Sequence, residues 1–182
     1  ASRANMKAKF LTLFAAFAAG ALAVAAFAPF AFWPVSIASL AVLFGLAARA
    51  PGRRAGFALG YAYGLGLFLA GTSWIYVSLT LYGGMPGWMG ALAVLAFAAF
   101  LALYPGLAAM AIAGVRVPLA WRLAVVAPLA WGLAEWARGW VFTGFGWNGL
   151  GVAFHETPVL AQAADLLGVT GLAFVPVFVQ TV

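Results

Sequence analysis

Long runs of apolar residues, separated by short links rich in glycine, proline or charge, dominate the sequence. A helix needs about 20 apolar residues to cross a bilayer, whereas a membrane β-strand reads as about ten residues of alternating polarity. The runs here are long and do not alternate. They therefore predict an all-α integral membrane fold, a bundle of about six transmembrane helices with the last one truncated. The expected spans cover residues 10–27, 35–48, 55–81, 88–113, 119–136 and, incompletely, 171–182.

The first and last runs raise questions of processing and length. The basic start and alanine-rich first run also fit a cleaved signal peptide, although a retained run keeps the charge pattern regular. Residues 172–182 would reach about 16 Å as a helix, half of a hydrocarbon core of ~30 Å. We therefore expect the chain to continue beyond Val182.

The composition excludes a water-soluble globule. Hydrophobic residues make up 67% of the chain and charged residues 7%, against about 25% charged residues in soluble domains. The absence of cysteine excludes a thiol nucleophile, a thiolate metal site and a disulfide within these residues. A net charge of +6 would suggest a nucleic-acid partner for a soluble protein, but its placement here indicates membrane orientation and no nucleic-acid binding.

Basic residues gather in alternate links. Those before the first span, between the second and third and between the fourth and fifth hold Arg3, Lys7, Lys9, Arg49, Arg53, Arg54, Arg116 and Arg122. Cytoplasmic loops carry an excess of Lys and Arg, so we expect these links and the N-terminus in the cytoplasm. The opposite side carries Arg138, all three acidic residues and the long loop 137–170.

Gly56, Gly60 and Gly64 recur at four-residue spacing in the third predicted span. Such a ridge of small residues lets another helix backbone approach closely. Packing inside the bundle is favoured over dimerisation.

The segment from Glu135 to Gly151 carries the most unusual chemistry. Glu135 and Arg138 lie three residues apart at a predicted span end, so their side chains can pair on one helical face. Tryptophans flank them, as expected at the headgroup level, and a glycine-rich loop follows. The glycines at 144, 146 and 149 fit a dinucleotide fingerprint by spacing, but no strand precedes them, so that interpretation fails.

Arg138 has two interpretations that the sequence leaves open. It is either an interfacial residue tied to Glu135 or a group that holds a lipid phosphate. Nearby His155 lacks companions for a metal site and is expected to be a solvated loop residue. Residues 158–167 predict a short interfacial helix, because Pro158 suits its first turn and Gly168 its end.

Several motifs, in order along nearly the whole chain, resemble the membrane domain of apolipoprotein N-acyltransferases. The more specific one is Glu135-Trp136-x-Arg138-Gly139-Trp140, followed by Thr143-Gly144-Phe145-x-Trp147. Weaker ones are Phe27-Ala28-Pro29-Phe30, Gly71-Thr72-Ser73-Trp74 and Gly168-x-x-Gly171. The chain departs from the family at Gly146, where the family commonly has proline.

This resemblance implies an enzyme of eight spans with a nitrilase-like periplasmic domain. Its Glu-Lys-Cys triad takes an acyl chain from a phospholipid and passes it to the diacylglyceryl-modified cysteine of an apolipoprotein. That triad is expected beyond Val182, so no catalytic residue is assigned here and this chain alone should be inactive. Neither a cofactor nor a metal is expected. The lipid-binding candidates are Arg138, Glu135, Trp147, Phe145 and Trp74.

Taken together, the chain is predicted to be the membrane part of this acyltransferase in the bacterial inner membrane, where phospholipid and apolipoprotein are its partners. Two other classes stay open. A small transporter or channel subunit would place polar residues inside the spans at mid-depth. A structural membrane partner would have no site for a specific lipid.

Overall fold

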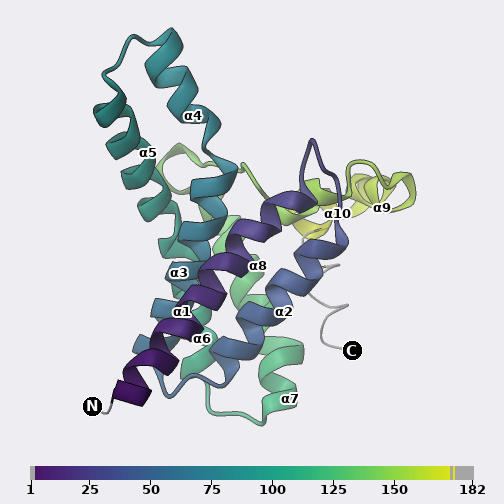
Figure 1. Cartoon of the computed structure of the whole chain (residues 1–182). Coiled ribbons are helices and arrows are strands. Elements are labelled where there is room, and N and C mark those ends of the chain that lie inside the picture. Colours follow the sequence, from purple (N-terminus) through teal and green to yellow (C-terminus); the bar gives the residue numbers. More distant parts are fainter. Residues whose placement is uncertain (1–2, 173, 175–182) are drawn as a thin grey trace.

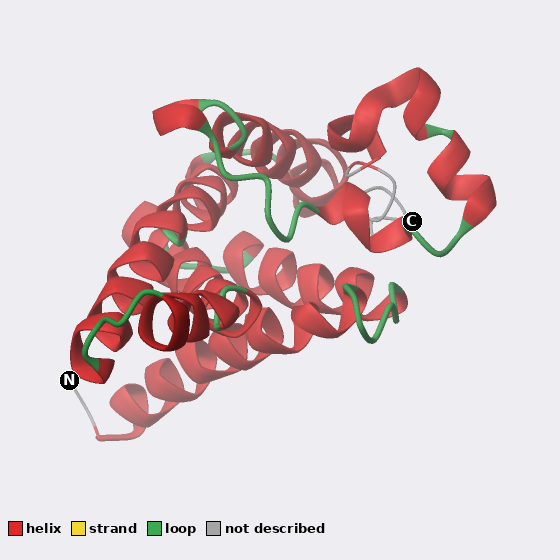
Figure 2. Cartoon of the chain, turned by 90° about the horizontal axis from the view of Figure 1, so that it is seen from above, coloured by secondary structure: helices red, strands yellow, loops and turns green. Residues whose placement is uncertain are grey.

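The computed structural model describes residues 3–172 and residue 174, and this part of the chain is helical with no strand (Figure 2). The helices are α1 (Arg3–Ala23), α2 (Pro34–Ala48), α3 (Arg53–Gly71), α4 (Trp74–Val77), α5 (Gly87–Leu101), α6 (Leu103–Gly114), α7 (Leu119–Trp121), α8 (Ala127–Arg138), α9 (Pro158–Gln162) and α10 (Ala164–Leu172). Short π-helical segments, Ser78–Tyr82 and Arg122–Val126, continue α4 and join α7 to α8. Short 3-10 turns are Val24–Ala26, Val141–Thr143 and Leu150–Phe154.

The all-α membrane fold is confirmed, with differences between the hydrophobic runs and the helices. Among the described residues, Asn5–Ala26 and Gly87–Gly114 are each long and apolar enough to cross a membrane. Arg53–Gly71 and Trp74–Tyr82 meet this test together but are bent by 48°. At 15 residues, α2 reaches only about 22 Å, less than a ~30 Å core. The six-span count and the loop 137–170 stay predictions, and most of the last span lies outside the described residues.

The bend between α3 and α4 was not expected from the apolar run that covers both helices. Gly71 is followed by two hydroxyl residues, and the Thr72 hydroxyl donates to the Phe68 carbonyl at 2.6 Å. The Ser73 hydroxyl likewise donates to the Ala70 carbonyl at 2.9 Å. Hydroxyl groups that bond the preceding turn compete with the helical ladder and bend helices. Beyond this bend, α4 and α5 form a hairpin that projects from the rest of the bundle (Figure 1).

The glycine ridge of α3 packs inside the bundle, which confirms the interpretation favoured from its spacing. A Cβ added to Gly60 would collide with the Pro105 carbonyl of α6, and one on Gly64 would meet Ala102 at 2.7 Å. A second pair of glycines, Gly20 of α1 and Gly66 of α3, allows the same close approach between α1 and α3. This contact could not be predicted from residue spacing within either apolar run. Glycines thus let α3 approach α1 and α6 backbone to backbone.

A buried chain of hydroxyl groups joins the first three helices. Ser39 lies 2.7 Å from the Ala19 carbonyl and 2.8 Å from the Tyr63 hydroxyl. Because a serine hydroxyl has one hydrogen and the carbonyl can only accept, Ser39 donates to Ala19 and Tyr63 donates to Ser39. Tyr63 is 1% exposed, so this bond satisfies a phenol that would otherwise be costly to bury.

The segment after the glycine-rich loop lies at the side of the bundle (Figure 1). The single helix predicted at residues 158–167 is divided into α9 and α10, and Gly168 interrupts α10 with φ 68°. Neither glycine nor proline stands at the first break, so the sequence holds no local signal for it. His155 is half-exposed and lies 3.7 Å from the Glu156 carboxylate.

Candidate functional site

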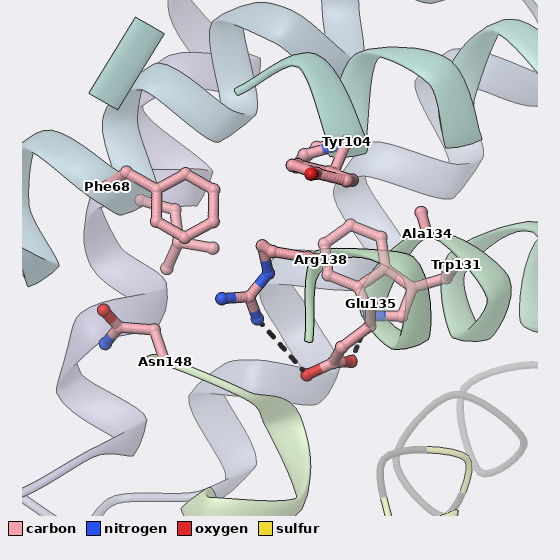
Figure 3. Close-up of a pocket in the computed structure, with 9 residues that line it drawn as sticks. Phe68, Tyr104, Trp131, Ala134, Glu135, Arg138 and Asn148 are labelled. Atoms are coloured by element: carbon pink, nitrogen blue, oxygen red, sulfur yellow. Dashed lines mark hydrogen bonds and ion pairs between the residues drawn. The ribbon is translucent and has the colours of Figure 1, made fainter. Parts of the chain in front are cut away.

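A small cavity opens where α3, α6, α8 and the glycine-rich loop meet (Figure 3). Its polar groups include the carboxylate of Glu135, the guanidinium of Arg138 and the side-chain amide of Asn148. Figure 3 shows Phe68 of α3 and Tyr104 of α6 on the opposite wall from the carboxylate. The cavity therefore surrounds the charged pair that the sequence singled out.

Glu135 is held by three groups from two parts of the chain. One carboxylate oxygen accepts a hydrogen bond from the Leu150 backbone N–H at 2.6 Å, and the other accepts from the Trp131 indole at 3.0 Å. The Arg138 guanidinium lies 3.7 Å from the first oxygen, so the pair predicted from the spacing is present. With its side chain 10% exposed, Glu135 is compensated by two donors and one cation.

Arg138 binds the loop that follows it. Its Nη1 donates to the Phe145 carbonyl at 2.6 Å and to the Trp147 carbonyl at 2.7 Å, and its guanidinium lies 5.2 Å from the centre of the Phe68 ring. Both hydrogens of Nη1 are therefore used inside the protein. At 5% exposure, the side chain is a buried brace rather than a free interfacial cation.

The aromatic candidates lie around this brace. Trp147 donates its indole N–H to the Gly71 carbonyl at 3.0 Å, and its ring lies 5.2 Å from that of Trp74. The Phe145 ring packs edge-on against Phe97 at 4.9 Å. All five residues singled out from the sequence thus meet where α3 bends and α8 ends. Trp74 and Trp147 stay about half-exposed.

The glycine-rich loop has an unusual backbone. Phe142, Thr143 and Asn148 all have positive φ, at 52°, 75° and 56°. Each such residue costs about 1–3 kcal/mol and persists only where the surroundings impose it. The two carbonyl bonds of Arg138, together with the bond between Glu135 and the Leu150 N–H, supply that constraint.

Two glycines of this loop should respond differently to the same change. A Cβ at Gly146 meets no atom within 4 Å, whereas Gly144 has φ 80° and a Cβ there collides with the Gly139 carbonyl. We expect Gly146→Ala to change the free energy of unfolding by less than about 1 kcal/mol. Gly144→Ala should cost at least ~2 kcal/mol. Thermal unfolding of both variants in detergent would test this, and equal midpoints would contradict the loop conformation.

Sequence reasoning missed several residues of the site. Trp131 stands four residues before Glu135, so helical spacing would have found it. Tyr104 and Phe68 come from other helices and carry no such signal. The Asn148 side-chain oxygen is buried and has no hydrogen-bond partner among the described residues.

Among the described residues, no three His, Asp, Glu or Cys side chains gather as metal ligands would. The buried hydroxyls of Ser36, Ser39 and Thr72 donate to backbone carbonyls within the bundle. Arg138 and Glu135 together hold the glycine-rich loop in one position at the end of α8.

Comparisons with known proteins agree with this architecture. A family model described as the apolipoprotein N-acyltransferase N-terminal domain matches residues 19–182. The apolipoprotein N-acyltransferase of Ralstonia nicotianae is 45% identical over 156 residues, which cover 84% of this chain and 30% of that protein. The one from Pasteurella multocida is 36% identical over 178 residues, 98% of this chain and 33% of that protein. The chain thus spans about a third of the length of these curated relatives.

Proposed function

The chain belongs to the apolipoprotein N-acyltransferase family, and we propose that it forms the membrane part of an enzyme that acylates apolipoproteins. In this proposal the whole protein takes an acyl chain from a phospholipid and transfers it to the amino group of the N-terminal diacylglyceryl-cysteine. The observation that carries the proposal is the match of the family over residues 19–182.

We place the chemistry in a nitrilase-like domain of the carbon–nitrogen hydrolase superfamily, encoded beyond Val182. A thiolate there would attack the ester carbonyl of the phospholipid, the lysolipid alkoxide would leave, and a thioester would form. The acceptor amine would then attack the thioester and release the thiol. The membrane part would hold the acyl donor and place its ester within reach.

Within that division of labour, Trp147, Trp74 and Phe145 are the residues we propose to contact lipid, because they are aromatic and lie at the helix ends. Arg138 and Glu135 act as positioning residues. Both hydrogens of Arg138 Nη1 bind the carbonyls of Phe145 and Trp147, so in this proposal the guanidinium holds the loop in place. Its effect on lipid binding therefore passes through the loop.

We further propose that the protein is a multi-pass inner-membrane protein with its N-terminus in the cytoplasm. Single cysteines at Pro51, between α2 and α3, and at Tyr82, which is 83% exposed at the tip of the hairpin, should then lie on opposite sides. In intact cells, and with the proposed catalytic cysteine changed to serine, a membrane-impermeant maleimide should label the full-length protein at position 82 and not at 51. Labelling of both positions, or only of position 51, would overturn this topology.

Acyl-enzyme formation provides the direct test of function. Given phospholipid with a labelled acyl chain, the full-length protein should acquire a hydroxylamine-sensitive label, and residues 1–182 should acquire none, since they hold no cysteine. Full-length protein with the catalytic cysteine changed to serine is the matched control. A label that survives this change, or one on residues 1–182, would contradict the proposed mechanism.

A further inference from the structure

The hairpin of α4 and α5 projects from the bundle as one unit (Figure 1). Gly90 of α5 lets its two legs pack closely, because a Cβ at that position would meet the Thr80 side chain at 2.7 Å and the Tyr76 ring at 3.5 Å. Toward the tip, Tyr82 and Trp88 are 83% and 69% exposed. Side chains this exposed give the hairpin little support at its tip, so its direction depends on contacts at its base.

The bend at the base of the first leg releases a backbone acceptor. In a regular helix the Ile75 N–H would donate to the Gly71 carbonyl, four residues earlier. Here it donates to the Thr72 carbonyl at 3.0 Å, so the helical ladder leaves out the Gly71 carbonyl. That carbonyl accepts instead from the Trp147 indole N–H at 3.0 Å. Trp147 of the glycine-rich loop thus takes the hydrogen-bonding position that the bend opens.

The loop makes two further contacts at this base. A Cβ at Gly71 would collide with the side-chain amide of Asn148, which lies directly against the glycine backbone. The ring of Trp147 lies 5.2 Å from that of Trp74, the first residue of α4. The loop therefore holds the end of α3 and the start of α4 together across the break.

The second leg of the hairpin meets the same loop. The Phe145 ring packs edge-on against Phe97 of α5, with 4.9 Å between the ring centres. The Phe142 ring packs against Phe100 in a similar way, at 5.6 Å. Edge-to-face packing is a favoured geometry for aromatic pairs. Since α5 ends at Leu101, both contacts lie at the base of this leg.

Arg138 binds the two loop residues whose side chains reach the two legs. Its Nη1 donates to the carbonyls of Phe145 and Trp147, at 2.6 Å and 2.7 Å. The two hydrogens of one guanidinium nitrogen have fixed directions, so these bonds fix the two loop residues relative to each other. Arg138 is itself 5% exposed and lies beside Glu135. One short chain of contacts thus joins the buried pair to the projecting hairpin.

We propose that Arg138, Phe145 and Trp147 form a clamp that fixes the direction of the α4–α5 hairpin relative to the bundle. The hydroxyls of Thr72 and Ser73 permit the bend, but a break between two helices acts as a hinge unless other contacts hold it. The clamp supplies those contacts, and its three members are positioning residues. A ligand that draws the guanidinium away from the two carbonyls would release the hairpin, because the same hydrogens cannot serve both. The proposal does not depend on acyl transfer.

The test measures the direction of the hairpin in the full-length protein, held in nanodiscs and with the proposed catalytic cysteine changed to serine. Spin labels on cysteines at Phe32, 60% exposed between α1 and α2, and at Tyr82 report the distance from bundle to hairpin by double electron–electron resonance. The unaltered protein should give one narrow distribution. Trp147→Phe keeps an aromatic ring but loses the donor to Gly71, and Arg138→Lys replaces a rigid fork with a flexible amine. Each should about double the width of the distribution.

Two further variants separate the clamp from general stability. The matched control is Trp136→Phe on α8, where the tryptophan is 55% exposed and its ring pairs with that of Trp140. It should leave the distribution unchanged. Gly71→Ala should broaden the distribution with Arg138 intact, because the added Cβ pushes the Asn148 amide off the bend. Gel filtration verifies that each compared variant elutes as one symmetric peak.

Three results would overturn the clamp. The first is an unchanged width in both Trp147→Phe and Arg138→Lys, above all if Ser73→Ala broadens the distribution, since the hydroxyls of the bend would then set the direction alone. The second is equal broadening in Trp136→Phe, which would reflect a general loosening of this end of the bundle. The third is a broad distribution in the unaltered protein, because the hairpin would then have no fixed direction to hold.

Discussion

Replacing Arg138 with methionine should be among the most damaging single changes in this chain. Methionine fills a similar volume but leaves the Glu135 carboxylate buried without a cation, and the carbonyls of Phe145 and Trp147 lose their donor. Removing one partner of a buried ion pair costs about 3–5 kcal/mol. We expect a loss of that size in the free energy of unfolding of the full-length protein, measured in mixed micelles by tryptophan fluorescence.

Two conservative variants identify the reason for that loss. Arg138→Lys keeps the charge but cannot reproduce a planar fork, so it should still lose about 1.5–3 kcal/mol and slow thioester formation. Glu135→Gln keeps only one side-chain oxygen, so the Trp131 indole and the Leu150 N–H cannot both keep their acceptor. The Arg138 guanidinium also loses its anionic partner. If Arg138 were a free interfacial residue, Lys would replace it without measurable cost and Met with less than ~1 kcal/mol.

Gly60→Leu should be comparably damaging, for a steric reason. A Cβ at this position already collides with the Pro105 carbonyl, which is backbone and cannot rotate away. Overpacking a rigid core costs about 1–3 kcal/mol, and separating α3 from α6 would also move the wall that holds Tyr104. We expect a loss of at least ~3 kcal/mol in the free energy of unfolding, together with loss of acyl transfer in the full-length protein.

The matched control for this change is Gly45→Leu in α2. A Cβ there meets only the flexible guanidinium of Arg49, at 3.3 Å. Leucine is also the better helix former by about 0.8 kcal/mol, so this variant should be neutral or slightly more stable. Equal losses at Gly45 and Gly60 would show that glycine flexibility, and not the α3–α6 contact, sets the effect.

The sequence by itself determined the fold class, because the length and hydropathy of an apolar run are properties of a local segment. It also determined the Glu135–Arg138 pair, since a three-residue spacing brings side chains together on any helix. The four-residue spacing of Trp131 and Glu135 holds the same local signal, although Trp131 was not predicted. The glycine ridge of α3 was predictable for the same reason, although which helix packs on it was not.

Only the tertiary structure decided what those features do. The bend after Gly71 depends on hydroxyl bonds within one turn, which no hydropathy pattern encodes. Gly20 meets α3, and Tyr104 and Phe68 meet Arg138, only because separate helices cross. The sequence left two interpretations of Arg138 open, an interfacial residue tied to Glu135 and a group that holds a lipid phosphate. The structure shows Arg138 buried and bound to two loop carbonyls and Glu135, because a guanidinium removed from solvent must bind whatever acceptors the fold brings to it. Its role in holding a lipid phosphate stays a prediction.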